Sequence, residues 1–344
     1  MTRNAGSTSA VTVRGMAKYY GETKALDGVD LDVREGTVRG VLGPNGAGKT
    51  TLVRILSTLI RPDAGSATVA GWNVLQQPRQ LRRAIGLTGQ YASVDELLSG
   101  YENLYLIGRL LDLSAKGAKA RAMELLESFS LTEAAKRPVK TYSGGMRRRL
   151  DLAASMIGRP RVLFLDEPTT GLDPRTRNEV WQEVQRMVAE GSTVLLTTQQ
   201  MEEAEQLAGD LTVIDRGRVI AEGSVEALKR QVGGQTLTVR PARPEQLDEM
   251  VRCLAGHGAT AAGDELVLPV GGEEQLTAVI GELGRRGFGI AGIETRMPSL
   301  EDVFLAVTGG TEKDVPARQP EQDQQAEQDP SQSPSQSPSQ MERV

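Results

Sequence analysis

The sequence predicts an α/β protein in which a large domain with a largely parallel sheet precedes a smaller α+β domain. Two continuous apolar runs, at 161–166 and 192–198, are typical of strands that a parallel sheet buries on both faces. Between them, residues 176–191 have the period of a helix, and Gly191 marks its end. From Gly234 onward the strands and helices alternate differently, which indicates that a second domain begins there.

The large domain starts with short strands and a strongly patterned helix. Strands are expected at 11–20, 29–36 and 38–42. Residues 48–60 have helical periodicity, and the apolar stripe of this helix comprises Leu52, Ile55, Leu56 and Leu59. Two further helical segments, 97–113 and 119–131, belong to a helix-rich insertion. We therefore expect an α/β domain over 10–232 with a helical subdomain at about 91–155.

The second domain is predicted over 233–309. Its strands and helices come in the order of a split βαβ, or ferredoxin-like, arrangement. The segments are a strand at 236–240, a helix at 244–256, a strand at 265–270, a helix at 273–287 and a strand at 290–296. A final helix at 299–309 has one apolar stripe, formed by Leu300, Val303, Phe304 and Val307. No catalytic group of residues is recognisable in this domain.

Composition and charge restrict the class of protein. The 344 residues include 39% hydrophobic and 25% charged residues, which is ordinary for a globular chain with two domains. Residues 1–9 are expected to be flexible, and 310–344, rich in Gln, Ser and Pro, to be disordered. This tail carries most of the net charge of -5, so the remainder is near neutral and no nucleic-acid partner is expected.

Two absences in the sequence point to a soluble cytoplasmic chain. No apolar run approaches the roughly 20 residues of a membrane span, and the first residues lack the apolar core of a secretory signal. Cys253 is the only cysteine, which excludes an intrachain disulfide and favours a small core residue. His257 is the only histidine and lies in a Gly-rich stretch, where a role in a loop is expected.

A glycine-rich loop at 43–51, GPNGAGKTT, matches the pattern of a P-loop that binds nucleotide phosphates. Glycines let successive backbone N–H groups surround an anion, Lys49 supplies a positive charge, and Thr50 presents a hydroxyl to Mg²⁺. The preceding strand and following helix give the required context, and the helix dipole favours the phosphates. The candidate ligands of the phosphates are Gly43, Asn45, Gly46, Ala47, Gly48, Lys49, Thr50 and Thr51.

Two acids at the end of a buried strand supply the second half of such a site. Asp166 and Glu167 directly follow four apolar residues in VLFLDEPTTGLDP, at 162–174. Asp166 is suited to hold Mg²⁺ through water, and Glu167 to polarise the water that attacks the terminal phosphate. Because the pair follows a buried strand directly, catalysis is a better interpretation than a solvated acidic loop.

A third motif makes the combination specific. The stretch YSGGMRRRLDLA, at 142–153, together with the two motifs above resembles the ATP-binding cassette (ABC) superfamily over about residues 10–230. The resemblance implies the P-loop NTPase fold of an ABC nucleotide-binding domain, ATP and Mg²⁺ as cofactors, and a head-to-tail homodimer. Each of two ATP molecules would be held between one subunit's phosphate loop and the other's signature. The signature residues assigned to ATP are Ser143, Gly144 and Gly145.

Further roles follow from the same resemblance. Tyr20 matches the aromatic residue that stacks on adenine, with a packed core tyrosine as the alternative. Gln90 matches the glutamine that reaches Mg²⁺ and the attacking water and senses the membrane partner. Asp173 matches the loop that crosses the dimer interface, with capping of the next helix as the alternative. The arginines at 147–149 and the acids at 202–203 are expected to be solvated.

The resemblance also exposes a departure at residue 199. In the superfamily the strand after the acidic motif usually ends in a histidine that contacts the terminal phosphate, and Gln199 stands there. An amide donates a hydrogen bond to phosphate or water, but it does not exchange a proton near neutral pH as imidazole does. Because Glu167 is intact, Gln199 is predicted to position groups for catalysis and not to accept the proton.

A finer resemblance points to the daunorubicin/doxorubicin resistance ATP-binding proteins, over about residues 10–309. It is carried by TTQ followed by MEEAE, by TGQYASVDELLSGYENL, and by PSLEDVFLAVTG. It implies an ATPase peripheral to the cytoplasmic side of the cell membrane that drives drug export through a separate polytopic membrane subunit. The helical insertion would receive this permease near Tyr101, Leu104 and Tyr105, and internal packing is the alternative for these side chains.

Other functions stay open at this stage. Relatives with the same features export lipids or other hydrophobic compounds, and an importer ATPase is a further candidate. A soluble ABC ATPase acting on DNA or ribosomes is disfavoured because the sequence has one cassette, one cysteine and no sustained heptads.

Overall fold

The computed structural model describes residues 9–89, 94–232 and 235–308. Gln90 and the tail at 310–344 lie outside the described residues, as does almost all of the flexible segment expected at 1–9. Among the helices of the described ranges, none is both long and apolar enough to cross a membrane.

The centre of the first domain is a six-stranded sheet whose strands are parallel except at one edge, where β10 pairs antiparallel with β9. The predicted parallel sheet is therefore confirmed, and its two most apolar strands, β7 and β8, are buried along their whole lengths. In spatial order the strands are β10 (Arg218–Ser224), β9 (Asp210–Asp215), β3 (Val38–Leu42), β8 (Thr193–Thr198), β7 (Val162–Asp166) and β6 (Ile85–Thr88).

A second, antiparallel sheet covers one side of the first. In spatial order its strands are β2 (Thr23–Arg34), β1 (Ser9–Tyr20), β4 (Ala64–Val69) and β5 (Trp72–Asn73). Helix α1 (Lys49–Leu56) contacts strands of both sheets. One apolar core joins them, with Val11 from the antiparallel sheet, Leu52 from α1, and Phe164 and Leu195 from the parallel sheet. Burial on both sides thus fixes the helix that follows the phosphate loop.

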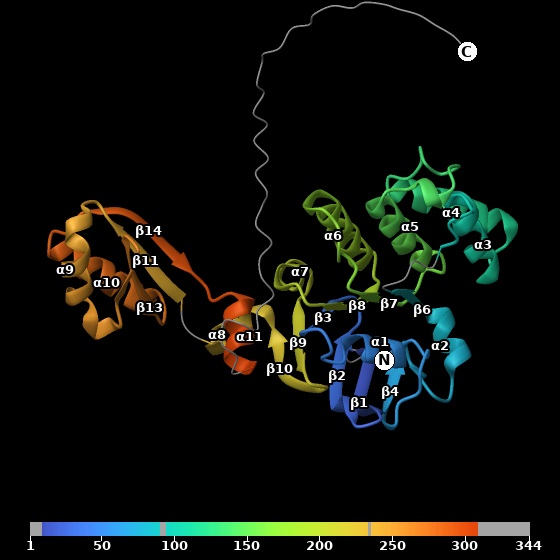
Figure 1. The fold of residues 1–344 in the computed structure, drawn as a ribbon, viewed down its shortest axis with the longest axis horizontal. Helices are drawn as coiled ribbons and strands as arrows, with labels where there is room; N and C mark the ends of the chain where they lie inside the picture. Colours follow the sequence, from blue (N-terminus) through green and yellow to red (C-terminus); the bar gives the residue numbers. More distant parts are fainter. Residues whose placement is uncertain (1–8, 90–93, 233–234, 309–344) are drawn as a thin grey trace, which may run out of the picture.

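Most of the remaining helices of the first domain lie on the other side of the parallel sheet, and α3, α4 and α5 gather as the predicted helical subdomain (Figure 1), whereas α2 packs through Leu81 on the side of the antiparallel sheet. They are α2 (Pro78–Ala84), α3 (Gly100–Leu110), α4 (Ala115–Ser128), α5 (Gly144–Met156), α6 (Pro174–Ala189), α7 (Met201–Leu207) and α8 (Val225–Val232). One detail of the prediction is wrong, because α1 ends at Leu56 and leaves Leu59 60% exposed. Helix α6 ends before Gly191, which adopts a left-handed φ of 100°.

The second domain has the ferredoxin-like topology that the sequence predicts, and it includes one short strand, β12, that the sequence prediction missed. Its four antiparallel strands, in spatial order, are β12 (Thr260–Ala262), β13 (Glu265–Val270), β11 (Gln235–Pro241) and β14 (Ile290–Arg296). Helices α9 (Leu247–Cys253) and α10 (Glu273–Arg285) supply the rest of its apolar core. Cys253 is partly buried against this core, and His257 lies in a short 3-10 helix, Ala255–His257, that follows α9.

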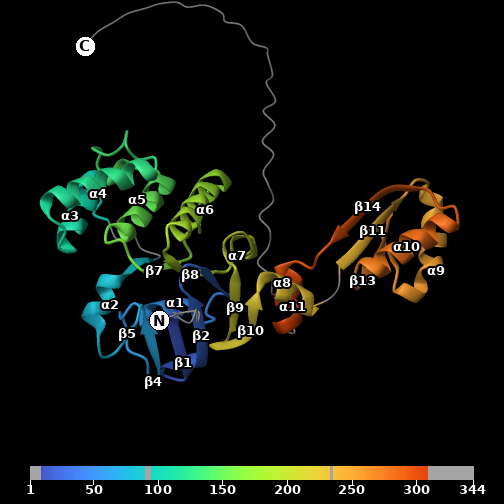
Figure 2. The ribbon, with the colours of Figure 1, turned by 180° about the vertical axis from the view of Figure 1, so that it is seen from behind.

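The last helix, α11 (Leu300–Thr308), returns to the first domain. It lies beside α8 in both ribbon views (Figure 1, Figure 2), and Leu300 and Val303 join the large apolar core of the first domain. Glu205 of α7 accepts a hydrogen bond from the backbone N–H of Leu300 at 3.0 Å and pairs with Lys229 of α8 at 3.0 Å. The segment predicted as the second domain therefore contains one element that packs on the first, while the boundaries at 232 and 309 stay predictions.

Candidate functional site

The phosphate loop joins the end of β3 to the start of α1, and two of its glycines are required by the geometry. Gly48 has a φ of +109°, and a Cβ there would lie 2.3 Å from the carbonyl oxygen of Ala25. A Cβ on Gly43 would lie 2.2 Å from the carbonyl oxygen of Ile214. Any larger residue would therefore displace neighbouring backbone. Asn45 and Gly46, at the tip of the loop, are exposed and accessible to a ligand.

Lys49 is buried beneath this loop. Its side chain is 4% exposed, and Nζ donates to the carbonyl oxygens of Gly43 at 2.7 Å and Pro44 at 3.0 Å. Nζ also lies 3.6 Å from Oε1 of Glu167. Burial lowers the pKa of Lys49, and the charge of Glu167 opposes that effect. The geometry thus places one cation between the phosphate loop and the acid expected to activate water.

The hydroxyl of Thr50 and the carboxylate of Asp166 converge at the carboxyl edge of the parallel sheet. Thr50 Oγ1 donates to Asp166 Oδ1 at 3.3 Å, and Thr197 Oγ1 of β8 donates to the same oxygen. Asp166 is 3% exposed. An oxygen donor set of hydroxyl and carboxylate is the kind that Mg²⁺ prefers, so these residues fit the metal that the sequence predicts. Thr197 was missed because nothing in its strand distinguishes it from its neighbours.

Glu167 has a backbone conformation that its residue type rarely adopts. Its φ is 50°, in the left-handed region, which costs of order 1–3 kcal/mol for a residue other than glycine. The backbone N–H of Glu167 donates to the carbonyl oxygen of Thr197 at 3.0 Å, and Thr170 Oγ1 donates to Glu167 Oε2 at 3.4 Å. The surrounding structure therefore holds the catalytic candidate in a strained position, as is common at functional sites.

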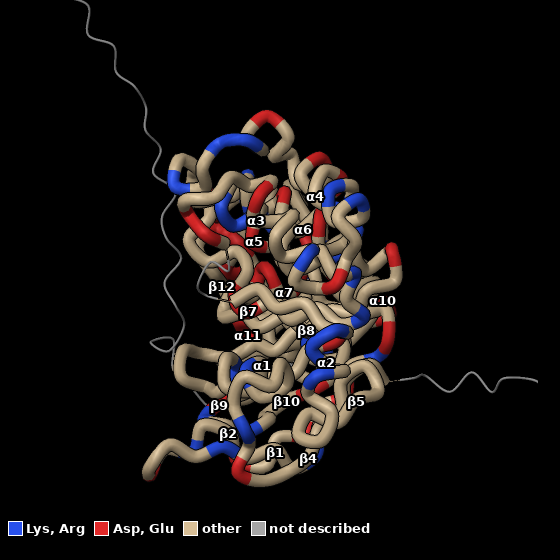
Figure 3. Tube along the Cα trace, turned by 90° about the vertical axis from the view of Figure 1, so that its right-hand side faces the viewer, with Lys and Arg blue, Asp and Glu red and all other residues tan. Residues whose placement is uncertain are grey.

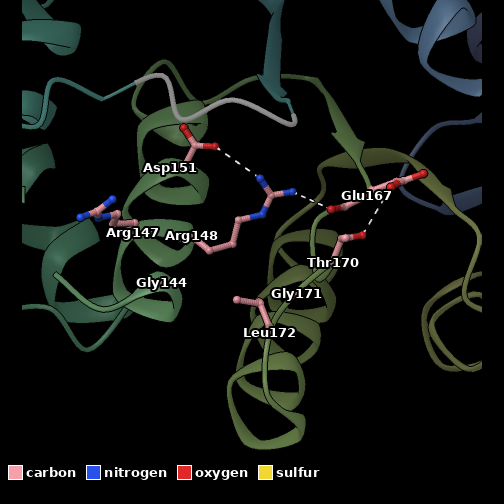
Figure 4. Close-up of a pocket in the computed structure, with 8 residues that line it drawn as sticks. All are labelled: Gly144, Arg147, Arg148, Asp151, Glu167, Thr170, Gly171 and Leu172. Carbon is pink, nitrogen blue, oxygen red and sulfur yellow. Dashed lines mark hydrogen bonds and ion pairs between the residues drawn. The ribbon is translucent and has the colours of Figure 1, made fainter. Parts of the chain in front are cut away.

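The signature motif forms the start of α5. Ser143 is the N-cap, and its Oγ accepts a hydrogen bond from the backbone N–H of Met146 at 3.2 Å. Gly144 is exposed, and a Cβ on Gly145 would lie 2.8 Å from Thr176 of α6. The close approach of α5 to α6 thus depends on glycine at 145. Gly144 also lines a pocket between the start of α5 and the segment that follows β7, which contributes Glu167 and Thr170 (Figure 4).

Arg148 contradicts the expectation of a solvated helix face. Its side chain is 14% exposed and extends from α5 toward the end of β7 (Figure 4), whereas the side chains of Arg147 and Arg149 are 37% and 19% exposed, so the expectation is wrong for Arg149 as well. Arg148 donates to the carbonyl oxygens of Gly89 and Glu167, each at 2.8 Å, and its Nη1 lies 3.7 Å from Oδ2 of Asp151. Arg148 precedes the buried residues Asp151 and Leu152 by three and four positions and so lies on the same helix face. This spacing is the signal in the sequence that indicates a buried Arg148.

Glu203 is a second buried charge that the prediction placed in solvent. It is 1% exposed on α7, and its Oε1 accepts from Thr169 Oγ1 at 2.7 Å and from Trp181 Nε1 at 3.4 Å. Burial raises the pKa of its carboxyl group. Glu202 is exposed, as expected. Position 203 precedes Leu207 by one helical turn, so the helical period places Glu203 on the buried face. The charge of Glu203 had instead suggested exposure to solvent.

The other predicted residues lie on different elements of the first domain. Tyr20 ends β1 and is 49% exposed, which does not fit a packed core tyrosine, and Lys18 Nζ lies 5.6 Å from the centre of its ring. Asp173 caps α6 by accepting from the backbone N–H of Thr176 at 3.0 Å. Gln199 follows β8 at the edge where Asp166 ends β7, because Asp166 pairs in register with Thr197. The ATP contacts of these residues stay predictions.

Two family models match the chain. The model described as ABC transporter matches residues 26–170, and the model described as ATP-binding protein DrrA1-3-like, C-terminal domain, matches 223–308. The second match begins before α8 and ends with α11, so it includes both helices of the pair that joins the domains.

Curated relatives match along most of the chain. The daunorubicin resistance ATP-binding protein DrrA2 of Streptomyces coeruleorubidus is 54% identical over 90% of this chain and 98% of its own length. The daunorubicin/doxorubicin resistance ATP-binding protein DrrA of Streptomyces peucetius is 48% identical over 89% and 94%. The Nod factor export ATP-binding protein I of Ralstonia nicotianae is 38% identical over 90% and 97%.

Solved structures match somewhat less than two thirds of the chain. An ATP-binding subunit of an ABC transporter aligns with a TM-score of 0.60 and 26% identity, over 64% of this chain and 92% of its own. A dimeric ATP-binding cassette with ADP and phosphate bound, in a post-hydrolysis state, aligns with a TM-score of 0.57 and 26% identity, over 62% and 98%. The chain therefore belongs to the family of daunorubicin/doxorubicin resistance ATP-binding proteins, ABC transporter subunits that bind ATP and couple its hydrolysis to transport.

Proposed function

We propose that this chain is the ATP-hydrolysing subunit of an exporter that removes a hydrophobic drug of the anthracycline kind. The observation that carries the proposal is the 54% identity to a daunorubicin resistance ATP-binding protein over 90% of the chain, which includes the phosphate loop, the acidic pair and the signature. This support favours the exporter over an ATPase that acts on DNA or ribosomes.

Glu167 is the proposed general base of hydrolysis. It takes the proton from the water that attacks the terminal phosphate of ATP, while Lys49 and the N–H groups of the phosphate loop hold the β- and γ-phosphates. Thr50 and Asp166 are proposed to hold Mg²⁺, which supplies charge neutralisation on the phosphates when bound. Gln199 donates a hydrogen bond to phosphate or to water and leaves proton transfer to Glu167.

The second half of each ATP site is proposed to come from another copy of the chain. The exposed segment Ser143–Gly144 begins α5, so its N–H groups are available to an anion from outside the subunit. A dimeric cassette among the solved structures supports this arrangement. Binding of ATP across the interface would favour the closed dimer, and hydrolysis would reopen it.

The helical subdomain is the proposed contact with a polytopic membrane subunit, which places the chain at the cytoplasmic face of the cell membrane. Leu104 is fully buried and belongs to the core, while Tyr101 and Tyr105 stack with ring centres 6.0 Å apart. Two large apolar side chains of α3 are exposed, Leu106 at 46% and Leu110 at 73%. Exposed apolar side chains on one helix suit a partner surface.

Purification of the full-length chain from gently solubilised membranes, with ATP and Mg²⁺ present, tests this proposal. We expect a stoichiometric membrane protein with several spans to co-purify, and expression of the pair to protect a sensitive host from daunorubicin. Recovery with ribosomes or DNA and without a membrane protein would contradict it. Export without drug protection would favour a different hydrophobic cargo, a possibility supported by the 38% identical Nod factor export protein.

A further inference from the structure

We propose that Arg148 is a positioning residue for ATP hydrolysis, which links the signature helix to the backbone that carries Glu167. The inference deepens the proposed function and rests on the role assigned there to Glu167. Arg148 lies five residues after Ser143, on the same helix that presents the signature. Its guanidinium points away from the signature surface, toward the end of β7 (Figure 4).

The hydrogen bonds of Arg148 join three separate segments. Nη2 donates to the carbonyl oxygen of Glu167 at 2.8 Å, Nε donates to that of Pro168, and Nη1 donates to that of Gly89 at 2.8 Å. Gly89 follows β6 and is the residue before Gln90 in the chain. A planar guanidinium with several fixed N–H groups is suited to bridge such acceptors, and one ammonium group is not. Arg148 therefore connects α5 with the ends of β6 and β7.

The contact with Glu167 acts on a strained peptide. Because Glu167 has a φ of 50°, its backbone would relax toward a more populated region if the surrounding hydrogen bonds were removed. Arg148 holds the carbonyl group of Glu167, and Thr197 holds its N–H group. Rotation of this peptide would move the carboxylate of Glu167 away from its place beside Lys49, where Oε1 and Nζ are 3.6 Å apart.

The surroundings keep the arginine in this place. Its side chain is 14% exposed, and Asp151, 2% exposed, lies one helical turn further along α5 with its Oδ2 at 3.7 Å. Burial lowers the pKa of Arg148, and the nearby carboxylates of Asp151, Glu203 and Asp166 counter this effect. A buried cation is held by surrounding acids and carbonyl oxygens, because moving away from them would remove the interactions that offset its own burial.

This geometry has a consequence in a dimer of the proposed kind. The signature of one subunit would contact the ATP bound to the partner's phosphate loop, whereas Glu167 serves the ATP bound to its own. Within one chain, Arg148 lies between the signature and Glu167. A shift of α5 when the signature engages the partner's ATP would therefore move the carbonyl group of Glu167, which acts on the ATP of its own subunit. Arg148 is thus placed to couple the two hydrolysis sites.

The test uses the full-length chain purified with its membrane subunit and compares Arg148→Met, Arg148→Lys and Glu167→Gln. We expect Arg148→Met to lower kcat roughly 100-fold, since a misplacement of about 1 Å has an effect of this order, and to change KM for ATP less than about threefold. Arg148→Lys restores the charge without the fork of donors, so its kcat should lie between those of Arg148→Met and the unchanged protein. Cooperativity in ATP, measured as the Hill coefficient, should fall in both variants.

The control is Arg186→Met on α6, because Arg186 is 42% exposed and pairs only with Glu183 and Glu190 among the contacts of the described residues. It should leave kcat within about twofold, as expected of a surface substitution. A kcat of Arg148→Met close to that of the unchanged protein, while Glu167→Gln is inactive, would overturn the inference. So would a loss confined to KM or one matched by unfolding at assay temperature. Full activity of Glu167→Gln would instead overturn the proposed role of Glu167.

Discussion

The two domains treat charged side chains differently. In the first domain Lys49, Asp151, Asp166 and Glu203 are all at most 4% exposed, and three of them lie in or directly beside the nucleotide-site motifs. In the described part of the second domain, the buried residues are apolar, and ion pairs such as Arg240 with Glu265 lie at the surface. Lys and Arg residues are interspersed with Asp and Glu residues along the backbone trace (Figure 3).

This difference separates stability from function. Burying a charge is costly, and an apolar core of similar volume often gives a more stable protein. The second domain follows that rule. The first departs from it at the carboxyl edge of the parallel sheet, where buried Lys49 is suited to a phosphate and buried Asp166 to Mg²⁺. In the first domain, removing a buried charge should therefore act mainly on catalysis. In the second domain, truncating a buried apolar side chain should act mainly on the stability of the fold.

The largest effect is expected for Glu167→Gln. The amide keeps the size of the side chain but cannot accept a proton, so kcat should fall roughly 100- to 10,000-fold while ATP still binds. Steady-state hydrolysis and equilibrium binding of ATP check this. Glu226→Gln, at an exposed acid on α8, should leave both quantities unchanged. Comparable losses of hydrolysis in Glu167→Gln and Glu226→Gln would contradict the special role of buried charges at the nucleotide site.

The next effect is expected in the core of the second domain. Leu268 of β13 is fully buried, so Leu268→Ala should lower the stability of this domain by about 2–5 kcal/mol. Amide hydrogen exchange of β11 and β13 should accelerate, while ATP hydrolysis persists. Val267→Ala, on the opposite face of the same strand, should have a smaller effect on exchange. Loss of hydrolysis in Leu268→Ala alone would show that the domains are not independent.

A smaller effect, dependent on pH, is expected for Glu203→Gln. Because burial raises the pKa of Glu203 above its ordinary value of 4.5, folding favours the neutral carboxyl group. That contribution is complete below the unfolded pKa and is lost as pH rises through the raised value in the folded protein. The amide does not ionise and keeps an acceptor for Thr169 and Trp181. The difference in Tm, variant minus unchanged protein, should therefore increase from about pH 4.5 upward. A difference independent of pH would refute this.

The smallest effect is expected at Gln199. Since Gln199 positions groups and Glu167 accepts the proton, Gln199→His should change kcat less than about tenfold. The unchanged protein should show no limb near pH 6.5 in its profile of kcat against pH, because that is the region where a histidine titrates. A limb there would contradict the assignment, as the only histidine, His257, lies in the second domain.

Local patterns in the sequence predicted the elements whose signal is contained within a short segment. The phosphate loop needs glycines at fixed spacing, and Gly43 and Gly48 indeed have no room for a Cβ. The parallel strands β7 and β8 are continuous apolar runs because both faces are covered. The ferredoxin-like order of the second domain likewise follows from a regular succession of strands and helices.

Contacts between distant segments decided the rest. A sequence assigns Arg148 and Glu203 to helices but does not say what lies opposite, so their charges suggested solvent. Packing of α5 and α7 against the sheet edge buried both, and carbonyl groups of the ends of β6 and β7 became the partners of Arg148. Helix α11 has an apolar stripe, but the stripe alone does not specify the domain on which the helix packs. Its packing beside α8 includes a hydrogen bond to Glu205, which is 95 residues away from Leu300 in the chain.

The sequence by itself thus determined the nucleotide chemistry and the elements that have a strong local pattern, because residue types at short spacing specify both. Only the tertiary structure decided which charges are buried, that α11 packs on the first domain, and that Arg148 holds the strained peptide of Glu167. The physical reason is that desolvation and hydrogen bonding depend on what surrounds a group in space, and those neighbours are supplied by residues far apart along the chain.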